Sequence, residues 1–241
     1  MKRPHDNWAT FYDFVYERTF GNLYNNLTTE TLNVINGIMP TGTIIDYGAG
    51  TGRLTIPLKK QGYEIIAVEQ SSGMVNQLKY KSENLNLEIS IHNCPISEFK
   101  NGKTDLALAL FTVLSYATTE NELSENVKNI CNQLKENGYF FFDLPNSVFF
   151  NTERLINIQS NEFNRSVNLK ANNNDDVYTY SEKCSGVFNG KKFDYEDEFS
   201  IRNWKLDKVD QLLKSSGLKP LQTVFNQFNS TGSTYNLYQK I

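Results

Sequence analysis

A glycine-rich segment near residue 50 has the residue types and spacing of a nucleotide-binding turn. It runs from Gly48 to Gly52 as GAGTG and directly follows the β-branched run from Thr43 to Asp46. Glycines let a ligand approach the backbone, and the helix expected after the turn offers free N–H groups. The segment therefore predicts a site for a ligand that contains a nucleoside.

The spacing of these glycines narrows the choice of ligand. Dinucleotide-binding folds use Gly-x-Gly-x-x-Gly, whereas this chain has Gly-x-Gly-x-Gly after an acid, Asp46, and it lacks the Gly-Lys-Ser/Thr of a P-loop. Glu69 ends the next expected strand, where a carboxylate can accept hydrogen bonds from both ribose hydroxyls. NAD and ATP therefore fit poorly. The structural alternative is a tight turn without a ligand and a solvated carboxylate at a strand end.

The composition is typical of a folded protein that does not bind nucleic acid or a membrane. Hydrophobic residues make up 39% of the 241 residues, and the formal net charge is -3 at pH 7. No run of about 18 apolar residues occurs, and no apolar stretch follows the charged N-terminal residues. We therefore expect a soluble protein in the cytoplasm.

The cysteines and histidines give no pattern of metal or nucleophile chemistry. Cys94, Cys131 and Cys184 are widely spaced, and His5 and His92 are the two histidines of the chain. These residues form neither a typical zinc-binding pattern nor a nucleophile-histidine pair. We assign no metal ligand, and any catalytic residue stays unknown.

Strand and helix patterns alternate along most of the chain, as in an α/β fold. Short β-branched or apolar runs predict strands over 43–46, 64–69, 87–92, 104–111, 139–144, 221–228 and 234–239. Helical spacing predicts one or two leading helices within 11–38, followed by helices over 54–60, 72–81, 120–134 and 206–216. This order predicts a Rossmann-like, seven-stranded, mostly parallel sheet with helices on both faces.

Between residues 149 and 202 the pattern changes to alternating polar and apolar residues. The stretches 177–186 and 191–202 flank Asn189-Gly190, which is a strong hairpin signal. We expect a small antiparallel insertion here that selects the substrate or forms homodimer contacts. A cover for the sheet edge is the alternative.

The glycine turn resembles that of Rossmann-like, class I S-adenosylmethionine-dependent methyltransferases. The resemblance covers about residues 8–148 and, more loosely, 203–241. It implies S-adenosylmethionine as the cofactor, with its ribose on Glu69 and its amino acid part over the turn. The turn residues concerned are Asp46, Gly48, Ala49, Gly50 and Gly52. In these terms the chain is one methyltransferase domain, with a helical lid at 1–40, a core at 41–148 and 203–241, and the insertion at 149–202.

Five further residues are expected at the cofactor from the same resemblance. Gln70 and Met74 would pack beside adenine, although helix capping and core packing explain them equally well. Asn93 and Cys94 stand where the family has an Asp and a small residue, and an Asx turn is the alternative for Asn93. Phe111 follows the fourth strand, where the family places its active site.

The acceptor side is expected to carry aromatic residues. The segment from Phe111 to Tyr116 and the leading Tyr12 and Tyr16 resemble those of small-molecule and amino-sugar N-methyltransferases. Tyrosine hydroxyls or ring faces can bind an amine, with lid or core packing as the alternative. Asn146 and Trp204 are further candidates to face the acceptor.

The resulting hypothesis is in-line methyl transfer to a small-molecule acceptor, an amine in particular. No dedicated base is needed for an amine that binds neutral. Two alternatives stay open: an RNA or protein methyltransferase, and a non-catalytic protein that binds S-adenosylmethionine. The acidic balance, and the absence of an Asn/Asp-Pro-Pro-Tyr segment after the fourth strand, speak against the first alternative. The second alternative stays open because Asn93-Cys94 differs from the Asp and small residue that the family has at this position.

Overall fold

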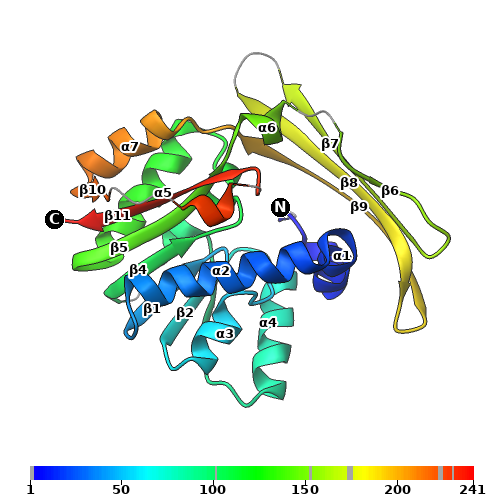
Figure 1. Cartoon of the computed structure of the whole chain (residues 1–241), viewed down its shortest axis with the longest axis horizontal. Helices are drawn as coiled ribbons and strands as arrows, with labels where there is room; N and C mark the ends of the chain where they lie inside the picture. Colours follow the sequence, from blue (N-terminus) through cyan, green and yellow to red (C-terminus); the bar gives the residue numbers. More distant parts are fainter. Residues whose placement is uncertain (1–2, 101, 152–153, 173–175, 222–224, 230) are drawn as a thin grey trace.

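The computed structural model contains two β-sheets, with helices packed on the larger one (Figure 1). It describes residues 3–100, 102–151, 154–172, 176–221, 225–229 and 231–241. None of the helices in these ranges is long and apolar enough to cross a membrane.

The larger sheet has seven strands in the order β10-β11-β5-β4-β1-β2-β3. Pairing is parallel except along β11, which runs antiparallel to both of its neighbours. The strands are β1 (Thr43–Tyr47), β2 (Glu64–Glu69), β3 (Ser90–Asn93), β4 (Thr104–Ala109), β5 (Leu134–Pro145), β10 (Leu218–Pro220) and β11 (Ser233–Lys240). This arrangement confirms the predicted Rossmann-like, mostly parallel sheet.

Helices cover both faces of this sheet because the side chains of each strand alternate between the two faces. On one face, α5 (Glu120–Gln133) and α7 (Leu206–Ser215) bury apolar residues against the sheet. On the other face, apolar residues are buried against the sheet by α2 (Asn22–Ile38), α3 (Thr55–Lys60) and α4 (Ser72–Asn84). The central strands are therefore buried on both sides.

The smaller sheet is the antiparallel insertion. Its strands β6 (Arg154–Ile158), β7 (Phe163–Asn172), β8 (Val177–Phe188) and β9 (Lys191–Arg202) pair in sequence order. Asn189 and Gly190 join β8 to β9 with φ of 49° and 75°, as a tight hairpin turn requires. The predicted hairpin is confirmed. In Figure 1 this curved sheet stands beside the large one, connected by α6 (Ser147–Phe150).

The N-terminal segment lies between the two sheets (Figure 1). It consists of the 3-10 helix η1 (Asp6–Phe11) and α1 (Tyr12–Phe20). Three short 3-10 helices lie elsewhere: η2 (Ile96–Glu98), η3 (Val113–Tyr116) and η4 (Asn226–Phe228). The N-terminal segment contacts α4 and β9, so it connects the cofactor-binding half of the large sheet to the small sheet.

Two predicted strands differ from the observed ones. The strand expected over 221–228 is wrong in its last part, because Asn226–Phe228 is the 3-10 helix η4, and residues 222–224 lie outside the described ranges. The sixth strand of the sheet is instead Leu218–Pro220, which pairs with the end of β11. The third strand begins at Ser90 rather than at residue 87.

Candidate functional site

A cavity of about 550 Å³ opens where β1, β2 and β4 end, and it extends to the small sheet. Glycine-turn residues line one end, and side chains of the N-terminal segment and of β7, β8 and β9 line the other. Many of the residues predicted from the sequence line it: Tyr12, Tyr16, Asp46, Gly48, Ala49, Gly50, Glu69, Gln70, Met74, Cys94, Phe111 and Tyr116. The topology thus brings segments from across the chain into one cavity.

The glycine turn leaves room for a ligand at Gly50. A Cβ built there would meet only the carbonyl oxygen of Gly48, at 4.0 Å. At Gly48 a Cβ would lie 2.4 Å from Cγ2 of Val113, so packing excludes any larger residue. Gly48 and Gly50 both have a positive φ, a conformation that residues with a side chain rarely adopt. Gly52 does not line the cavity and faces Leu78 instead.

Glu69 is held at the edge of this turn by backbone donors. Its Oε2 accepts a hydrogen bond from the Gly50 N–H at 2.9 Å, and its Oε1 accepts one from the Ser71 N–H at 2.8 Å. Burial raises the pKa of the Glu69 carboxyl above its ordinary value. A carboxylate has about four acceptor sites, so the two backbone bonds leave capacity for the two hydroxyls of a ribose.

Asp46 ends up beneath the turn, almost fully buried. Its Oδ2 accepts a hydrogen bond from the Thr55 hydroxyl at 2.6 Å. Burial raises the pKa of Asp46 to about 6, and the hydrogen bond from Thr55 opposes that shift. Because Asp46 also lines the cavity, its second carboxylate oxygen can receive a donor from a ligand.

The residues predicted beside adenine are only partly at the cavity. Gln70, Met74 and Cys94 line it, whereas Asn93 does not. The Asn93 amide donates to the Glu69 carbonyl oxygen at 2.9 Å and so ties β3 to β2. Ser71 caps α4 by accepting a hydrogen bond from the Met74 N–H at 3.2 Å, so capping and cavity lining coexist at this helix start. The sequence did not indicate three further lining residues: Pro95, Ile96 and Ser97.

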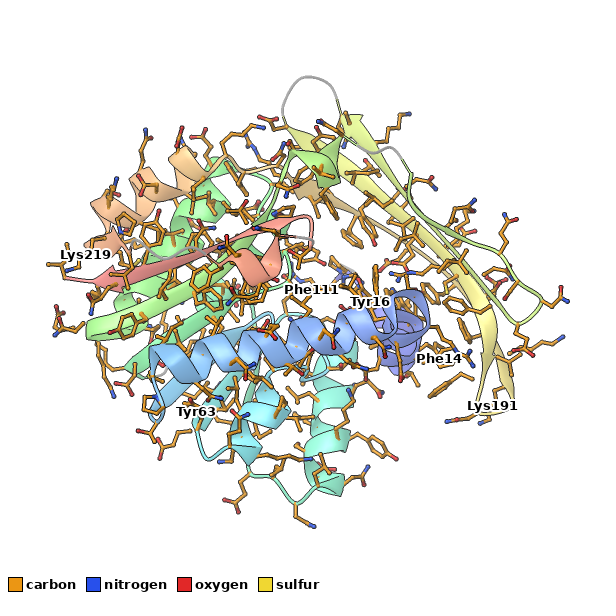
Figure 2. All side chains as sticks on the ribbon, in the orientation of Figure 1. Phe14, Tyr16, Tyr63, Phe111, Lys191 and Lys219 are labelled. Atoms are coloured by element: carbon orange, nitrogen blue, oxygen red, sulfur yellow. The ribbon has the colours of Figure 1, made fainter. Side chains whose placement is uncertain are left out.

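Aromatic rings form the wall opposite the turn. Tyr12 and Tyr16 stack with ring centroids 4.4 Å apart, and Tyr16 meets the edge of Phe111 at 5.6 Å. Figure 2 shows Tyr16 and Phe111 together between the large and the small sheet. Burial raises the pKa of Tyr12, Tyr16 and Tyr116, so these hydroxyls stay protonated and can act as hydrogen-bond donors.

His5 is a cavity residue that the sequence did not indicate. Its Nε2 lies 2.8 Å from the Tyr116 hydroxyl, and its backbone N–H donates to Asp197 at 2.7 Å. Burial lowers the pKa of His5 to about 4, although Asp197 opposes that shift. His5 is therefore neutral near pH 7. No local pattern marks it, because its partners belong to η3 and β9.

Arg165 was also missed. This residue of β7 is among those that line the cavity, and its Nε donates to Glu182 Oε1 at 2.8 Å. The guanidinium carbon lies 4.6 Å from the centroid of the Tyr16 ring, so one face of this tyrosine is already covered by a cation. The alternation of β7 places Arg165 on the inner face with Val167 and Leu169, and that pattern was the available signal.

Asn146 and Trp204, predicted to face the acceptor, do not line the cavity. The side-chain Oδ1 of Asn146 accepts hydrogen bonds from the Val148 and Phe149 N–H groups at 2.9 and 3.4 Å, and so caps α6. Trp204 is buried in the core beside α5 and α7, and its Nε1 donates to the Ala117 carbonyl oxygen at 2.8 Å. Helix capping and core packing account for the placement of both side chains.

Asp6 fixes the N-terminal segment to the cofactor-binding half. Its Oδ1 accepts hydrogen bonds from the Ser71 hydroxyl at 2.7 Å and from the Gly73 N–H at 3.0 Å, at the N-terminus of α4. From the same segment, Trp8 donates to Asp197 of the small sheet at 3.1 Å. The segment therefore closes one side of the cavity. Within the described residues no group of three or more His, Cys, Asp or Glu side chains could hold a metal ion.

Comparison with known proteins shows similarity to methyltransferases in the part of the chain that contains the glycine turn. Residues 44–138, which include the glycine turn and Glu69, match the family model of the methyltransferase domain. The Bacillus subtilis (strain 168) protein YqeM, which is named provisionally as a methyltransferase, is 26% identical over 203 residues. That match covers 79% of this chain and 78% of YqeM.

Two solved structures share the fold over nearly the whole chain. An S-adenosylmethionine-dependent methyltransferase from Clostridium acetobutylicum ATCC 824 superposes with a TM-score of 0.81 at 20% identity, covering 96% of this chain and 98% of that one. The sugar N-methyltransferase KedS8 from Streptoalloteichus sp. ATCC 53650 gives a TM-score of 0.72 at 15% identity, covering 95% and 92%. Residues 44–138 therefore resemble a methyltransferase domain, and the chain as a whole has a Rossmann-like fold that solved methyltransferase structures share.

Proposed function

We propose that this chain is an S-adenosylmethionine-dependent methyltransferase and that it transfers the methyl group to the amine of a small molecule. The observation that carries the proposal is the single cavity lined by the glycine turn at one end and by aromatic side chains at the other. One cavity of this kind can hold a methyl donor and a small acceptor together.

At the cofactor end of the cavity, the residues present fit S-adenosylmethionine, the methyl donor. The open space at Gly50 accepts the close approach of a ligand, and Glu69 has free acceptor capacity for ribose hydroxyls. Asp46 lies where it can receive the amino group of the ligand. We assign cofactor contacts to these residues and to Gly48, Ala49, Gln70, Met74, Cys94 and Phe111, which also line the cavity.

At the acceptor end, we assign contacts to Tyr12, Tyr16 and Tyr116. When bound, S-adenosylmethionine supplies an electrophilic methyl group on a sulfonium. The work of the chain is to align the acceptor and to exclude water, and such orientation is worth roughly 7 to 11 kcal/mol of a barrier. The stacked tyrosines and the N-terminal segment provide a rigid, largely apolar wall for this purpose.

Two observations favour a small amine over a macromolecule. The chain has a net charge of -3, which gives no general attraction for a nucleic acid backbone. The fold is shared with the sugar N-methyltransferase KedS8. Protonated tyrosine hydroxyls and the neutral His5 also suit an amine that binds without its extra proton.

The proposal is tested by a methyl-transfer screen with radiolabelled S-adenosylmethionine. The panel holds small amines, matched alcohols and carboxylic acids, a folded RNA and a protein mixture, and label in the product is counted. We expect label in amines, with kcat/KM well above that of the matched alcohols. Transfer to RNA or protein alone, or tight binding of S-adenosylmethionine without transfer to any acceptor, would contradict the proposal.

A further inference from the structure

The side chain of Arg165 is completely buried and yet has a free hydrogen-bond donor. Its Nε donates to Glu182 Oε1 at 2.8 Å, and its Nη1 donates to the Thr19 hydroxyl at 2.8 Å. Its Nη2 has no hydrogen-bond partner among the residues that the structure describes, and the exposed fraction of the side chain is 0%. Buried donors normally have partners, so this nitrogen is available to bind a group of another molecule.

Of the ion pair formed by Arg165 and Glu182, only the arginine reaches the cavity. Arg165 lines it together with Tyr16 and Tyr180, whereas Glu182 does not line it. Glu182 Oε1 also accepts a hydrogen bond from Tyr195, and its Oε2 has no partner within the described part of the chain. A molecule in the cavity therefore meets the cationic member of the pair, with the anionic member behind it.

The guanidinium keeps its charge in this apolar setting. Burial by itself lowers the pKa of Arg165, but Glu182 and the neighbouring tyrosines raise it above its ordinary value. Guanidinium groups bind planar carboxylates with charge-assisted hydrogen bonds. One free donor beside an existing carboxylate suits a monoanion better than a phosphate dianion, because the second charge would be repelled by Glu182.

We propose that Arg165 binds the carboxylate of the methyl acceptor, so that the acceptor is a small amino carboxylic acid. This inference rests on the proposed amine methylation and names the class of its substrate. The acid group lies at the small sheet and the amine lies toward the glycine turn. The aromatic lining assigned to the acceptor, Tyr12 and Tyr16 in particular, would contact its apolar body.

A binding experiment tests the inference without turnover. The protein is loaded with S-adenosylhomocysteine and titrated calorimetrically with phenylacetate and with phenylacetamide, which has the same shape without the charge. A charged hydrogen bond predicts that phenylacetate binds about tenfold to hundredfold more tightly. Equal affinity for the two probes would overturn the inference.

Substitutions assign this preference to Arg165. Arg165→Lys keeps a cation beside Glu182 but lacks the second donor nitrogen, so we expect the preference to fall at least tenfold. The double variant Arg165→Met with Glu182→Gln removes both buried charges at once and should abolish the preference. Arg202→Lys is the matched control, because Arg202 also belongs to the small sheet but stacks on Trp204 outside the cavity lining. An unchanged preference in the Arg165 variants would contradict the assignment.

The inference and the proposed function fail in different ways. Unchanged binding of S-adenosylhomocysteine and an unchanged melting temperature show that each variant is folded. If amines are methylated but amino acids show no advantage over their amides, the inference is wrong and the amine proposal stands. If phenylacetate depends on Arg165 but no amine is methylated, the carboxylate site stands and the amine proposal is wrong.

Discussion

Asp13 of helix α1 accepts a hydrogen bond from the Thr51 hydroxyl in the glycine turn, at 2.6 Å between the two oxygens. The other carboxylate oxygen of Asp13 pairs with Lys81 of α4, and Lys81 also donates to the Thr51 carbonyl oxygen at 3.0 Å. The N-terminal segment is therefore bonded directly to the turn proposed to hold the cofactor. We expect that breaking these bonds eases the entry of a ligand on this side of the cavity.

Asp13→Ala should make the cofactor site easier to enter and to leave. The substitution removes the bonds to Thr51 and Lys81, so we expect the association and dissociation rates of S-adenosylhomocysteine both to rise, by about tenfold. Stopped-flow fluorescence of the buried Trp8 measures both rates. Glu17→Ala is the control, because Glu17 is exposed on the same helix. Rates unchanged by Asp13→Ala would show that the segment does not limit access.

Gly50→Val should abolish binding of S-adenosylhomocysteine. The valine side chain would fill the open space beside the turn, where the ligand has to approach the backbone. Calorimetric titration gives the affinity. Gly62→Val is the control, because Gly62 also has a positive φ and open surroundings but does not line the cavity. Equal loss of affinity in both variants would assign the effect to backbone strain.

Glu69→Ala should weaken cofactor binding by about tenfold to hundredfold, the usual effect of losing charged hydrogen bonds. It would remove the proposed acceptor for ribose hydroxyls and release the N–H groups of Gly50 and Ser71. The same titration measures the loss. Glu64→Ala, at the exposed start of β2, should leave the affinity unchanged. A Glu69 variant with the affinity of the wild type would show that the ribose does not lie there.

The buried carboxyl of Asp46 should make stability depend on pH. Its pKa in the folded chain is about 6, above the ordinary 3.8, because of burial. Its favourable contribution is therefore present below pH 4 and is lost as the pH rises through 6, up to about 3 kcal/mol. Urea unfolding from pH 4 to 7 should show the wild type losing stability relative to Asp46→Asn. A difference that is constant with pH would contradict this pKa.

Tyr116→Phe should reduce methyl transfer without affecting the cofactor. It removes the hydroxyl that lies 2.8 Å from His5 and keeps the ring, so we expect kcat/KM for the acceptor to fall about threefold to tenfold. Affinity for S-adenosylhomocysteine should stay unchanged. Tyr80→Phe, at an exposed tyrosine of α4, is the control. A loss of cofactor affinity in Tyr116→Phe would place the hydroxyl at the other end of the cavity.

Patterns within a few residues predicted much of the fold. The alternation of apolar runs with amphipathic segments gave the mostly parallel sheet, and Asn189-Gly190 marked the hairpin of the small sheet. The strand expected over 221–228 was wrong in part, since a short run with apolar residues does not distinguish a strand from a 3-10 helix packed on the sheet. Local propensity only weakly favours one conformation in such segments, and tertiary packing determines which one forms.

By itself, the sequence determined the glycine turn and Glu69, because both depend on neighbours along one strand-turn-helix unit. Only the tertiary structure decided which side chains face the cavity. It brought His5 to Tyr116 and Arg165 to Tyr16, and it committed Trp204 to the core. These contacts join segments that are far apart in the chain. No local periodicity encodes them, because they arise when the N-terminal segment and the insertion pack over the ends of the parallel strands.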